Sequence, residues 1–512
     1  MPLHLLDSAP MDAPRLLALA GSDDGFAYSE AALARLAADR VVVQAHVAAG
    51  EPVYGLNTGL GGNLGYRLDS SEVLVYQQQI IRGRMVGMGE PLPALVARAA
   101  LLARCIGLAR GGSGVSVSAA QGLLALLDRG VTPVVPGIGS ISAGDLGLCA
   151  HLVAPLFGEG EAWYQGQRCS GSQALARAGL EPVQLQAKDG LGLINASAVT
   201  AAYAALVACA VSDNLLVAAA VAALAAEGYA ANLSVLDSRI AAARPGAGQT
   251  AAAALFRALH AGSSLLQSKP RSPQDALSFR TMAPVFGVAF SVLGNVTEAV
   301  NVELNARADS PLVLAGQGDM LSTPNFHTPG IALAFDSMAI AITQLASASV
   351  QRIIKLQTPQ LSGLPKYLSP VGGASVGFNA MQKTAAALHA AIRLKATPAS
   401  LDAVVVSDMV EDHAAHAMLC IRKLDEQLQL YQYLVAVEAM LAAQALDLRG
   451  SVTPGAGSGA VSRTVRSVVA TLTHDRPGGL DAMRVSTALF DGPLATGLRQ
   501  TAGAAIAACG LS

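Results

Sequence analysis

Long apolar segments with helical spacing constrain the fold of this chain more than any other feature of its sequence. Apolar residues recur at the three- and four-residue spacing of a helix over residues 29–46, 94–110, 190–228, 330–355, 375–396 and 408–446. Two of these segments approach forty residues, whereas a typical globular helix has about 11–12. Strand-like alternation is rare. The sequence therefore predicts an all-α protein, or one that is predominantly so, with a long central helical bundle.

Loops rich in Gly and Pro separate the helical segments and are the places where functional residues gather in such proteins. They fall at residues 54–65, 111–114, 133–144, 359–373 and 453–459. Most of them precede the long bundle segments. We therefore expect a loop-rich catalytic region over residues 1–190 and a helical bundle over residues 191–512, continuous with each other as one structural unit.

The composition indicates that the chain associates with copies of itself. Of its 512 residues 52% are hydrophobic and 14% are charged, whereas roughly a quarter are charged in an average globular protein. The surplus apolar surface is most simply buried in a homo-oligomer. The net charge is −2 and no basic stripe is interleaved with aromatic residues. Nucleic acid is therefore not an expected partner.

A second set of features indicates a cytoplasmic enzyme without a metal. The N-terminus carries Asp7 and Asp12 before its first Arg, which is unlike a signal peptide. The charge-free residues 190–212 are long enough to cross a bilayer, but Ala, Gly, Ser and Thr predominate there, so we expect a buried core helix. Six cysteines lie scattered without CxxC spacing, which favours reduced thiols over a zinc site or disulfides.

A glycine-rich run, YGLNTGLGG, begins at Tyr54. Its glycines and small polar residues hold the Tyr by tight backbone rather than by packing. Such a run is either a plain turn or a loop that presents a phenol to a cleft. It resembles the YGxNTGxG loop of the histidine and aromatic ammonia-lyases, whose Tyr is the catalytic base of that family.

Eight further motifs follow in the order in which that family carries them. They are GMGEPL from Gly87, LARGGSG from Leu108, KDGLGLIN from Lys188, QDALSFR from Gln274, LNARADSPL from Leu304, NFH from Asn325, SGLP from Ser362 and SDMVEDH from Ser407. Any one of them is weak, but nine in order make chance implausible. The chain is identified as a member of this family on motifs that span most of its length. The resemblance implies a homotetramer with active sites shared between subunits and a small-molecule substrate.

The resemblance also assigns roles to several residues. It places the active-site Asn at Asn195, the carboxylate-binding Arg at Arg280, and an acidic residue near the substrate's ring or ammonium at Glu411. A bidentate guanidinium suits a substrate carboxylate, and Asn195 and Asn325 can add hydrogen bonds. A structural ion pair is the alternative for Arg280. Elimination needs a base for the β-proton, and Tyr54 is the candidate once nearby cations lower its pKa from about 10.

One segment departs from the family. The family forms 4-methylidene-imidazol-5-one by cyclising an internal Ala-Ser-Gly within GSVGASGDL. This chain reads GSISAGDL from Gly139, one residue shorter, with Ser142, Ala143 and Gly144 in the region of the tripeptide. No hydroxyl lies where the dehydration takes place in the family. We therefore expect an enzyme without this cofactor, the alternative being one that carries it.

The departure suggests a substrate whose amine is already activated. A trimethylammonium group leaves as neutral trimethylamine and has no lone pair with which to attack an electrophile. Ergothionase, a member of the family that lacks the cofactor, acts on such a substrate. The chain resembles it. We expect elimination of trimethylamine from ergothioneine, or from a related imidazole betaine, to give thiourocanate. The alternatives are a histidine ammonia-lyase that forms urocanate and ammonia with the cofactor, and a non-catalytic oligomeric binding protein.

Two further departures fit a changed substrate. Arg84 replaces a His of the histidine enzymes and can face a thione or thiolate sulfur, or else be a solvent-facing helix Arg. Lys383 replaces an apolar residue and can bind the ring or sulfur, or help to lower the pKa of Tyr54, or else be a structural Lys with an extended stem. A trimethylammonium group also favours aromatic faces or a carboxylate, for which Tyr54, Phe326 and Glu411 are candidates.

Overall fold

The computed structural model describes residues 2–50, 53, 58–59, 66–68, 72–401 and 404–511. The chain divides into two compact units, each made of three separate stretches. The first unit comprises Met1–Val207, Thr297–Leu333 and Ala399–Ile421, and the second comprises Ala208–Val296, Ala334–Pro398 and Arg422–Ser512. The expected division of the chain at residue 190 stays a prediction.

The first unit combines short helices with small sheets. Its helices are α1 (Ala13–Ala20), α2 (Glu30–Ala49), α3 (Glu72–Arg82), α4 (Ala94–Ala109), α5 (Val117–Asp128), α6 (Leu146–Val153), α7 (Gly171–Ala178) and α8 (Asp189–Ile194), with a 3-10 turn at Ala154–Phe157. Its strands are β1 (Leu3–Leu6), β2 (Gly25–Tyr28), β3 (Met88–Pro91), β4 (Thr132–Pro133), β5 (Pro136–Ile138), β6 (Glu161–Tyr164), β7 (Gln167–Ser170), β8 (Leu312–Leu314) and β9 (Asp319–Leu321). β1 and β2 pair in parallel, and the antiparallel sets are β3–β5, β4–β6–β7 and β8–β9.

Capping residues explain where several of these helices begin and end. The Ser29 side chain accepts a hydrogen bond from the backbone N–H of Ala32 and starts α2, which ends at Gly50 with a φ of 68°. Ser170 and Gln173 form a reciprocal capping box at the start of α7. These local hydrogen bonds set the ends of α2 and the start of α7 independently of the packing of the core.

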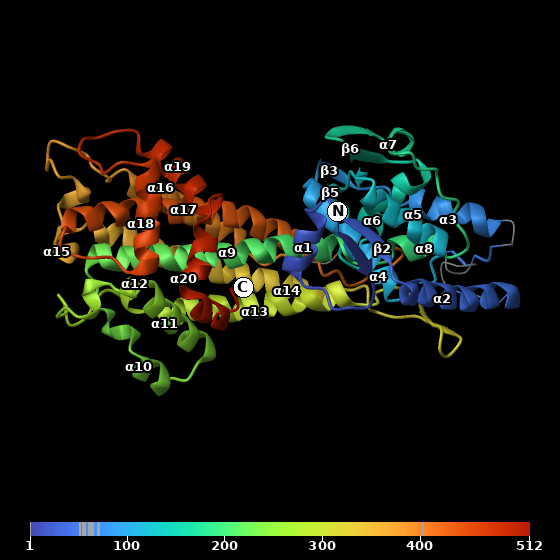
Figure 1. The fold of residues 1–512 in the computed structure, drawn as a ribbon, viewed down its shortest axis with the longest axis horizontal. Coiled ribbons are helices and arrows are strands. Elements are labelled where there is room, and N and C mark those ends of the chain that lie inside the picture. The colour runs from blue at the N-terminus through green and yellow to red at the C-terminus, as the bar shows by residue number, and fades with distance from the viewer. Residues whose placement is uncertain are drawn as a thin grey trace. The chain divides into compact units, whose positions relative to one another are not determined.

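Four long helices have part of their length in each unit. They are α9 (Ala198–Tyr229), α13 (Met282–Asn305), α14 (Pro329–Leu356) and α17 (Ala417–Arg449). In the second unit α9, α14 and α17 form a bundle of long neighbouring ribbons (Figure 1). A Cβ at Gly228 would lie 2.9 Å from the carbonyl oxygen of Ala442, so the small residue lets the α9 and α17 backbones approach closely.

Shorter helices complete the second unit. They are α10 (Ser238–Ala243), α11 (Ala247–Leu259), α12 (Leu277–Arg280), α15 (Pro359–Ser362), α16 (Met381–Lys395), α18 (Ala456–Val468), α19 (Gly478–Phe490) and α20 (Leu494–Ala508), with 3-10 turns at Leu233–Leu236, Ser264–Leu266 and Lys366–Leu368. Helix is the main structure of both units and strands are short. The predicted, predominantly α class with a bundle of long helices is confirmed.

Three helices begin later than the apolar spacing predicts. The predicted segment 190–228 divides into α8 and α9, so that α9 begins at Ala198. α16 begins at Met381 rather than at residue 375, because Asp475 accepts hydrogen bonds from the N–H groups of Val376 and Gly377. α17 begins at Ala417 rather than at residue 408. Residues 407–409 have φ values of 53–67°, a left-handed conformation that no α-helix contains.

Three helical stretches are long and apolar enough to cross a membrane by length and composition alone: Asp189–Tyr229, Met282–Asn305 and Pro329–Leu356. In the most apolar windows of these stretches, 78%, 39% and 61% of the residues respectively are buried within the structure. The first contains the charge-free residues 190–212, which extend from α8 into α9. Residues 190–204 are all buried, as a core helix requires.

A buried ion pair between α14 and α17 yields a stability prediction. Arg352 and Glu438 are both almost fully buried, and the Arg352 Nη2 atom lies 3.0 Å from Glu438 Oε2. Arg352→Met removes one charge and leaves the other buried without compensation. We expect a loss of about 3–5 kcal/mol in the free energy of unfolding, measured by urea denaturation.

Arg239→Met is the matched control, because Arg239 pairs with Asp237 on the surface of the same unit. Its urea midpoint should equal that of the wild type. Equal midpoints for both variants would show that the buried pair contributes nothing.

Candidate active site

A cavity of about 760 Å³ lies in the first unit where several loops converge. Its walls come from the turn after α3, the segment before α6, the loop before α14 and the loop that precedes α17. Asn195, at the end of α8, closes one side. All these walls belong to the same unit, and they contain several of the residues that the family motifs single out.

The segment 139–146 forms one wall of the cavity and is held from both sides. Ala143 forms an antiparallel bridge with His327, and the N–H of Gly144 donates to the Phe326 carbonyl over 2.8 Å. Behind the wall, the buried Asp145 carboxylate accepts hydrogen bonds from Ser140 Oγ at 2.9 Å and from Thr200 N at 2.7 Å. Burial raises the pKa of Asp145 above its ordinary value.

Asn195 lies directly beside this segment. A Cβ at Gly144, where φ is 72°, would lie 3.2 Å from Asn195 Oδ1, so only a glycine leaves the amide its space. The Asn195 Nδ2 group donates to the Ser310 carbonyl over 2.7 Å. Arg104 holds the chain near Asn195 and the chain at Ser310. It donates to the Leu193 carbonyl at 3.1 Å and pairs with Asp309 at 2.9 Å. Asn195 is thus fixed with its amide oxygen toward the tripeptide.

The loop 404–413 supplies another wall. Val406 and Glu411 exchange backbone hydrogen bonds of 3.1 and 3.3 Å, which close the loop on itself. Glu411 is half-buried and lines the cavity. His413 also lines it, and its Nδ1 atom lies 2.8 Å from Nε2 of His327 across the cavity wall.

The structure brings together some of the predicted site residues and leaves others apart. Arg84, Asn195, Phe326 and Glu411 line the cavity, as do Ala143 and Gly144 of the tripeptide. Among the described residues, none accepts a hydrogen bond from the Arg84 guanidinium. The Asn325 amide donates to the Arg307 carbonyl over 3.1 Å. The roles predicted for these residues stay predictions.

Asn325 and Ser142 do not line this cavity, and three further predicted residues are not placed in it. Arg280 and Lys383 belong to the second unit, where each is exposed. Arg280 donates to Gln274 over 3.1 Å and Lys383 to Asn379 over 3.2 Å. Tyr54 lies outside the described residues.

The two cavity histidines were not singled out from the sequence. His327 and His413 end the motifs NFH and SDMVEDH, so their proximity to Phe326 and Glu411 was the available signal. Burial, followed by the neighbouring His413 ring, lowers the pKa of His327. Among the described residues there is no cluster of three or more groups that could hold a metal ion.

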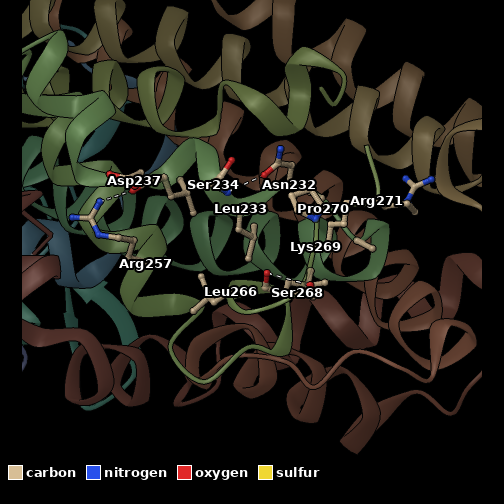
Figure 2. Close-up of a pocket in the computed structure, with 14 residues that line it drawn as sticks. Asn232, Leu233, Ser234, Asp237, Arg257, Leu266, Ser268, Lys269, Pro270 and Arg271 are labelled. Atoms are coloured by element: carbon tan, nitrogen blue, oxygen red, sulfur yellow. Dashed lines mark hydrogen bonds between the residues drawn. The ribbon is translucent and has the colours of Figure 1, made fainter. Parts of the chain in front are cut away.

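A second cavity, of about 370 Å³, lies in the second unit. Figure 2 shows Asn232 and Ser234 on one wall and Leu266 and Ser268 on the facing one. None of the residues predicted from the sequence lines it. The cavity of the first unit is therefore the candidate active site.

The fold and the cavity define a helical enzyme of the ammonia-lyase kind, and comparison with known proteins identifies its family. The family model "Aromatic amino acid lyase" matches residues 11–467. A histidine ammonia-lyase from Myxococcus xanthus is 36% identical over 501 residues, 97% of this chain and 99% of the relative. One from Anaeromyxobacter is 37% identical over 502 residues, 96% of this chain and 99% of the relative.

Solved structures agree with this assignment. The ergothioneine-degrading enzyme ergothionase from Treponema denticola has a TM-score of 0.93 and 28% identity, covering 96% of this chain and 99% of the other. Histidine ammonia-lyase from Trypanosoma cruzi has a TM-score of 0.88 and 30% identity, covering 98% and 96%. The chain belongs to the aromatic amino acid lyase family. It is a carbon–nitrogen lyase, so the alternative of a non-catalytic binding protein is set aside.

The expectation of an enzyme without a cofactor was wrong. The curated relatives that match nearly the whole chain are histidine ammonia-lyases, enzymes that use methylidene-imidazolone. The alternative, a cofactor formed from an internal tripeptide, is the one that these relatives support.

The described tripeptide does not fit the usual order from which that ring forms. Its middle residue, Ala143, has a methyl group and no water to lose. Ser142 has the only hydroxyl of the three, at a φ of 63°, and this oxygen accepts a hydrogen bond from Met418 N at 3.2 Å.

An acidic side chain behind the cavity wall yields a pH prediction. The Oε2 atom of Glu303 on α13 is buried and has no hydrogen-bond partner among the described residues. Burial, and then the charge of Asp145, raises the pKa of Glu303 from 4.5 to about 7. The unfolded chain therefore loses this proton at lower pH than the folded chain, and folding is increasingly penalised as pH rises from 4.5 to 7.

Glu303→Gln should remove that penalty. We expect the variant to be more stable than the wild type at pH 8 by up to about 3 kcal/mol, with the difference vanishing below about pH 4.5. Urea denaturation across this range measures it. Glu298→Gln, an exposed position on the same helix, is the control and should follow the wild type. A parallel pH dependence of Glu303→Gln and the wild type would contradict the assignment.

Proposed function

We propose that this lyase eliminates trimethylamine from ergothioneine, or from a related imidazole betaine, to form thiourocanate. The observation that carries the proposal is the polarity of the cavity walls. The guanidinium of Arg84, which pairs with no described residue, suits a thione or thiolate sulfur. Glu411 and the ring of Phe326 suit a trimethylammonium group.

The chemistry of this substrate matches those walls. When the base takes the β-proton, the electron pair of the C–H bond forms the double bond, and the C–N pair departs with neutral trimethylamine. The reaction therefore requires a base and groups that orient the betaine. Tyr54 is the proposed base, and Asn195 and Asn325 are proposed to orient the substrate. The likeness to ergothionase, at a TM-score of 0.93, supports this substrate class.

Arg280 is proposed to bind the substrate carboxylate. Lys383 is proposed to bind the substrate's ring or its sulfur, or to lower the pKa of the Tyr54 phenol. Both residues belong to the second unit, so we infer a homo-oligomer, a tetramer by resemblance, in which subunits share active sites. The apolar composition supports such an assembly. We also infer a cytoplasmic location from the scattered free cysteines.

A second candidate function is the elimination of ammonia from histidine to give urocanate. The specific observation in its favour is that the curated relatives are histidine ammonia-lyases at 36–37% identity over more than nine-tenths of the chain. This reaction would use the cofactor, because an unactivated amine departs reluctantly from carbon.

The two functions are separated by incubating the purified oligomer with each substrate. We expect trimethylamine and an absorbing conjugated product from ergothioneine, and a rate at least tenfold lower from histidine. Amine identity is determined by mass spectrometry and the product by its ultraviolet spectrum. Ammonia and urocanate from histidine, without trimethylamine from ergothioneine, would establish the second function. The mass of the peptide containing Ser142 then reports whether water has been lost.

Substitution of the proposed base tests the mechanism. Tyr54→Phe should lower kcat by at least a hundredfold and leave the substrate Kd largely unchanged, because only the proton acceptor is removed. Tyr164→Phe is the matched control. Its hydroxyl donates to the Arg177 carbonyl in the same unit and away from the cavity, so kcat should remain that of the wild type. Near-normal turnover by Tyr54→Phe would remove Tyr54 as the base.

A further inference from the structure

Two histidines form a hydrogen-bonded pair in the wall of the candidate active site. Nε2 of His327 lies 2.8 Å from Nδ1 of His413, and the two rings are nearly perpendicular, at 76° and 5.0 Å between centroids. Both rings line the cavity that also contains Arg84 and Glu411. Neither the predicted substrate groups nor the predicted base makes use of this pair.

The neighbours of His327 determine where its proton lies. With Nε2 directed at His413, the ring's other nitrogen, Nδ1, is left to face the Ser142 backbone, which acts on the pKa of His327. The Ser142 N–H already donates to Ser140 Oγ over 2.9 Å, so the Ser142 carbonyl must be the acceptor. His327 therefore carries its proton on Nδ1 when neutral, and burial lowers its pKa, which favours the neutral form.

The tautomer of His413 follows from that of His327. Since Nε2 of His327 presents a lone pair, Nδ1 of His413 must donate to it. The neutral His413 ring then has its own lone pair on Nε2. Among the described residues, none donates a hydrogen bond to this atom. The cavity walls also contain the charged groups of Arg84, Glu411 and Asp412.

We propose that His413 Nε2 accepts a hydrogen bond from a ring N–H of the substrate, and that His327 positions it by fixing its tautomer and orientation. The site thereby selects five-membered azole rings over phenyl rings, which have no N–H to offer. This assignment rests on the proposed function only in placing the substrate's ring in this cavity. His413 is then a specificity-determining residue.

Binding of two acrylates tests the proposal without any turnover. The probes are urocanate, which has an imidazole N–H, and cinnamate, which has a phenyl ring, titrated calorimetrically into the intact oligomer. Wild-type protein should bind urocanate more tightly. His413→Leu should reduce the ratio of the two affinities about tenfold, as expected for one lost hydrogen bond. His413→Gln retains an acceptor oxygen and should restore part of the ratio.

His474→Leu serves as the control, because His474 is an exposed histidine of the second unit and should leave the ratio unchanged. The proposal is overturned if His413→Leu keeps the wild-type ratio. It is also overturned if the folded wild type binds urocanate no more tightly than cinnamate, or binds neither. Failure of ergothioneine turnover, by contrast, leaves this binding ratio as it is and counts only against the proposed function.

Acylation by diethyl pyrocarbonate tests the assigned tautomers directly. A free imidazole lone pair attacks a carbonyl carbon of this reagent and displaces ethyl carbonate, so mass spectrometry of the wild type should find His413 modified and His327 protected. His413→Leu removes the donor to His327 Nε2 and should expose His327 to the reagent. Equal rates for the two residues in the wild type would overturn the positioning role of His327.

Discussion

The buried carboxylate of Asp145 holds together the parts of the first unit that form the cavity. It accepts hydrogen bonds from Ser140 Oγ and from both the N–H and the hydroxyl of Thr200, while its own N–H donates to the Ala196 carbonyl. No cation among the described residues forms an ion pair with it, and the oriented dipoles of these donors stabilise the carboxylate. The turn before α6 and the start of α9 are therefore tied to a single group.

Backbone contacts connect the residues beside Asp145 to the other walls of the cavity. The residues beside Asp145 pair with the stretch at Phe326 and His327, and His327 in turn bonds the loop that carries His413. Ser142 and residues 407–409 have positive φ, a conformation that costs energy in a non-glycine residue. This backbone belongs to two of the segments that form the walls of the candidate active site, where a preorganised site needs rigid loops.

Sequence reasoning succeeded where one local pattern determines one outcome. Helical spacing predicted both ends of α4 and α14 to within one residue and those of α2 to within three. Asn195 and Glu411 of the motifs line the cavity, and the roles predicted for them stay predictions. It could not anticipate the late starts of α16 and α17, which depend on Asp475 and on left-handed residues. The histidine pair depends on two loops 86 residues apart. The expectation of an enzyme without the cofactor was wrong because it relied on the tripeptide Ser142–Gly144 alone. The similarity to histidine ammonia-lyases extends along nearly the whole chain.

In the proposed function, recognition of the amine and recognition of the ring use different side chains of one cavity. Glu411 and Phe326 are proposed to bind the trimethylammonium group, whereas Arg84 and His413 are proposed to bind the ring and its sulfur, and all four residues line the cavity. A change of substrate within the family therefore needs only wall residues to change, while the long helices that support both walls stay as they are. This explains how one scaffold matches both ergothionase and histidine ammonia-lyases along nearly its full length. Substrate identity in this lyase is consequently a property of a few cavity side chains, and it has to be measured there.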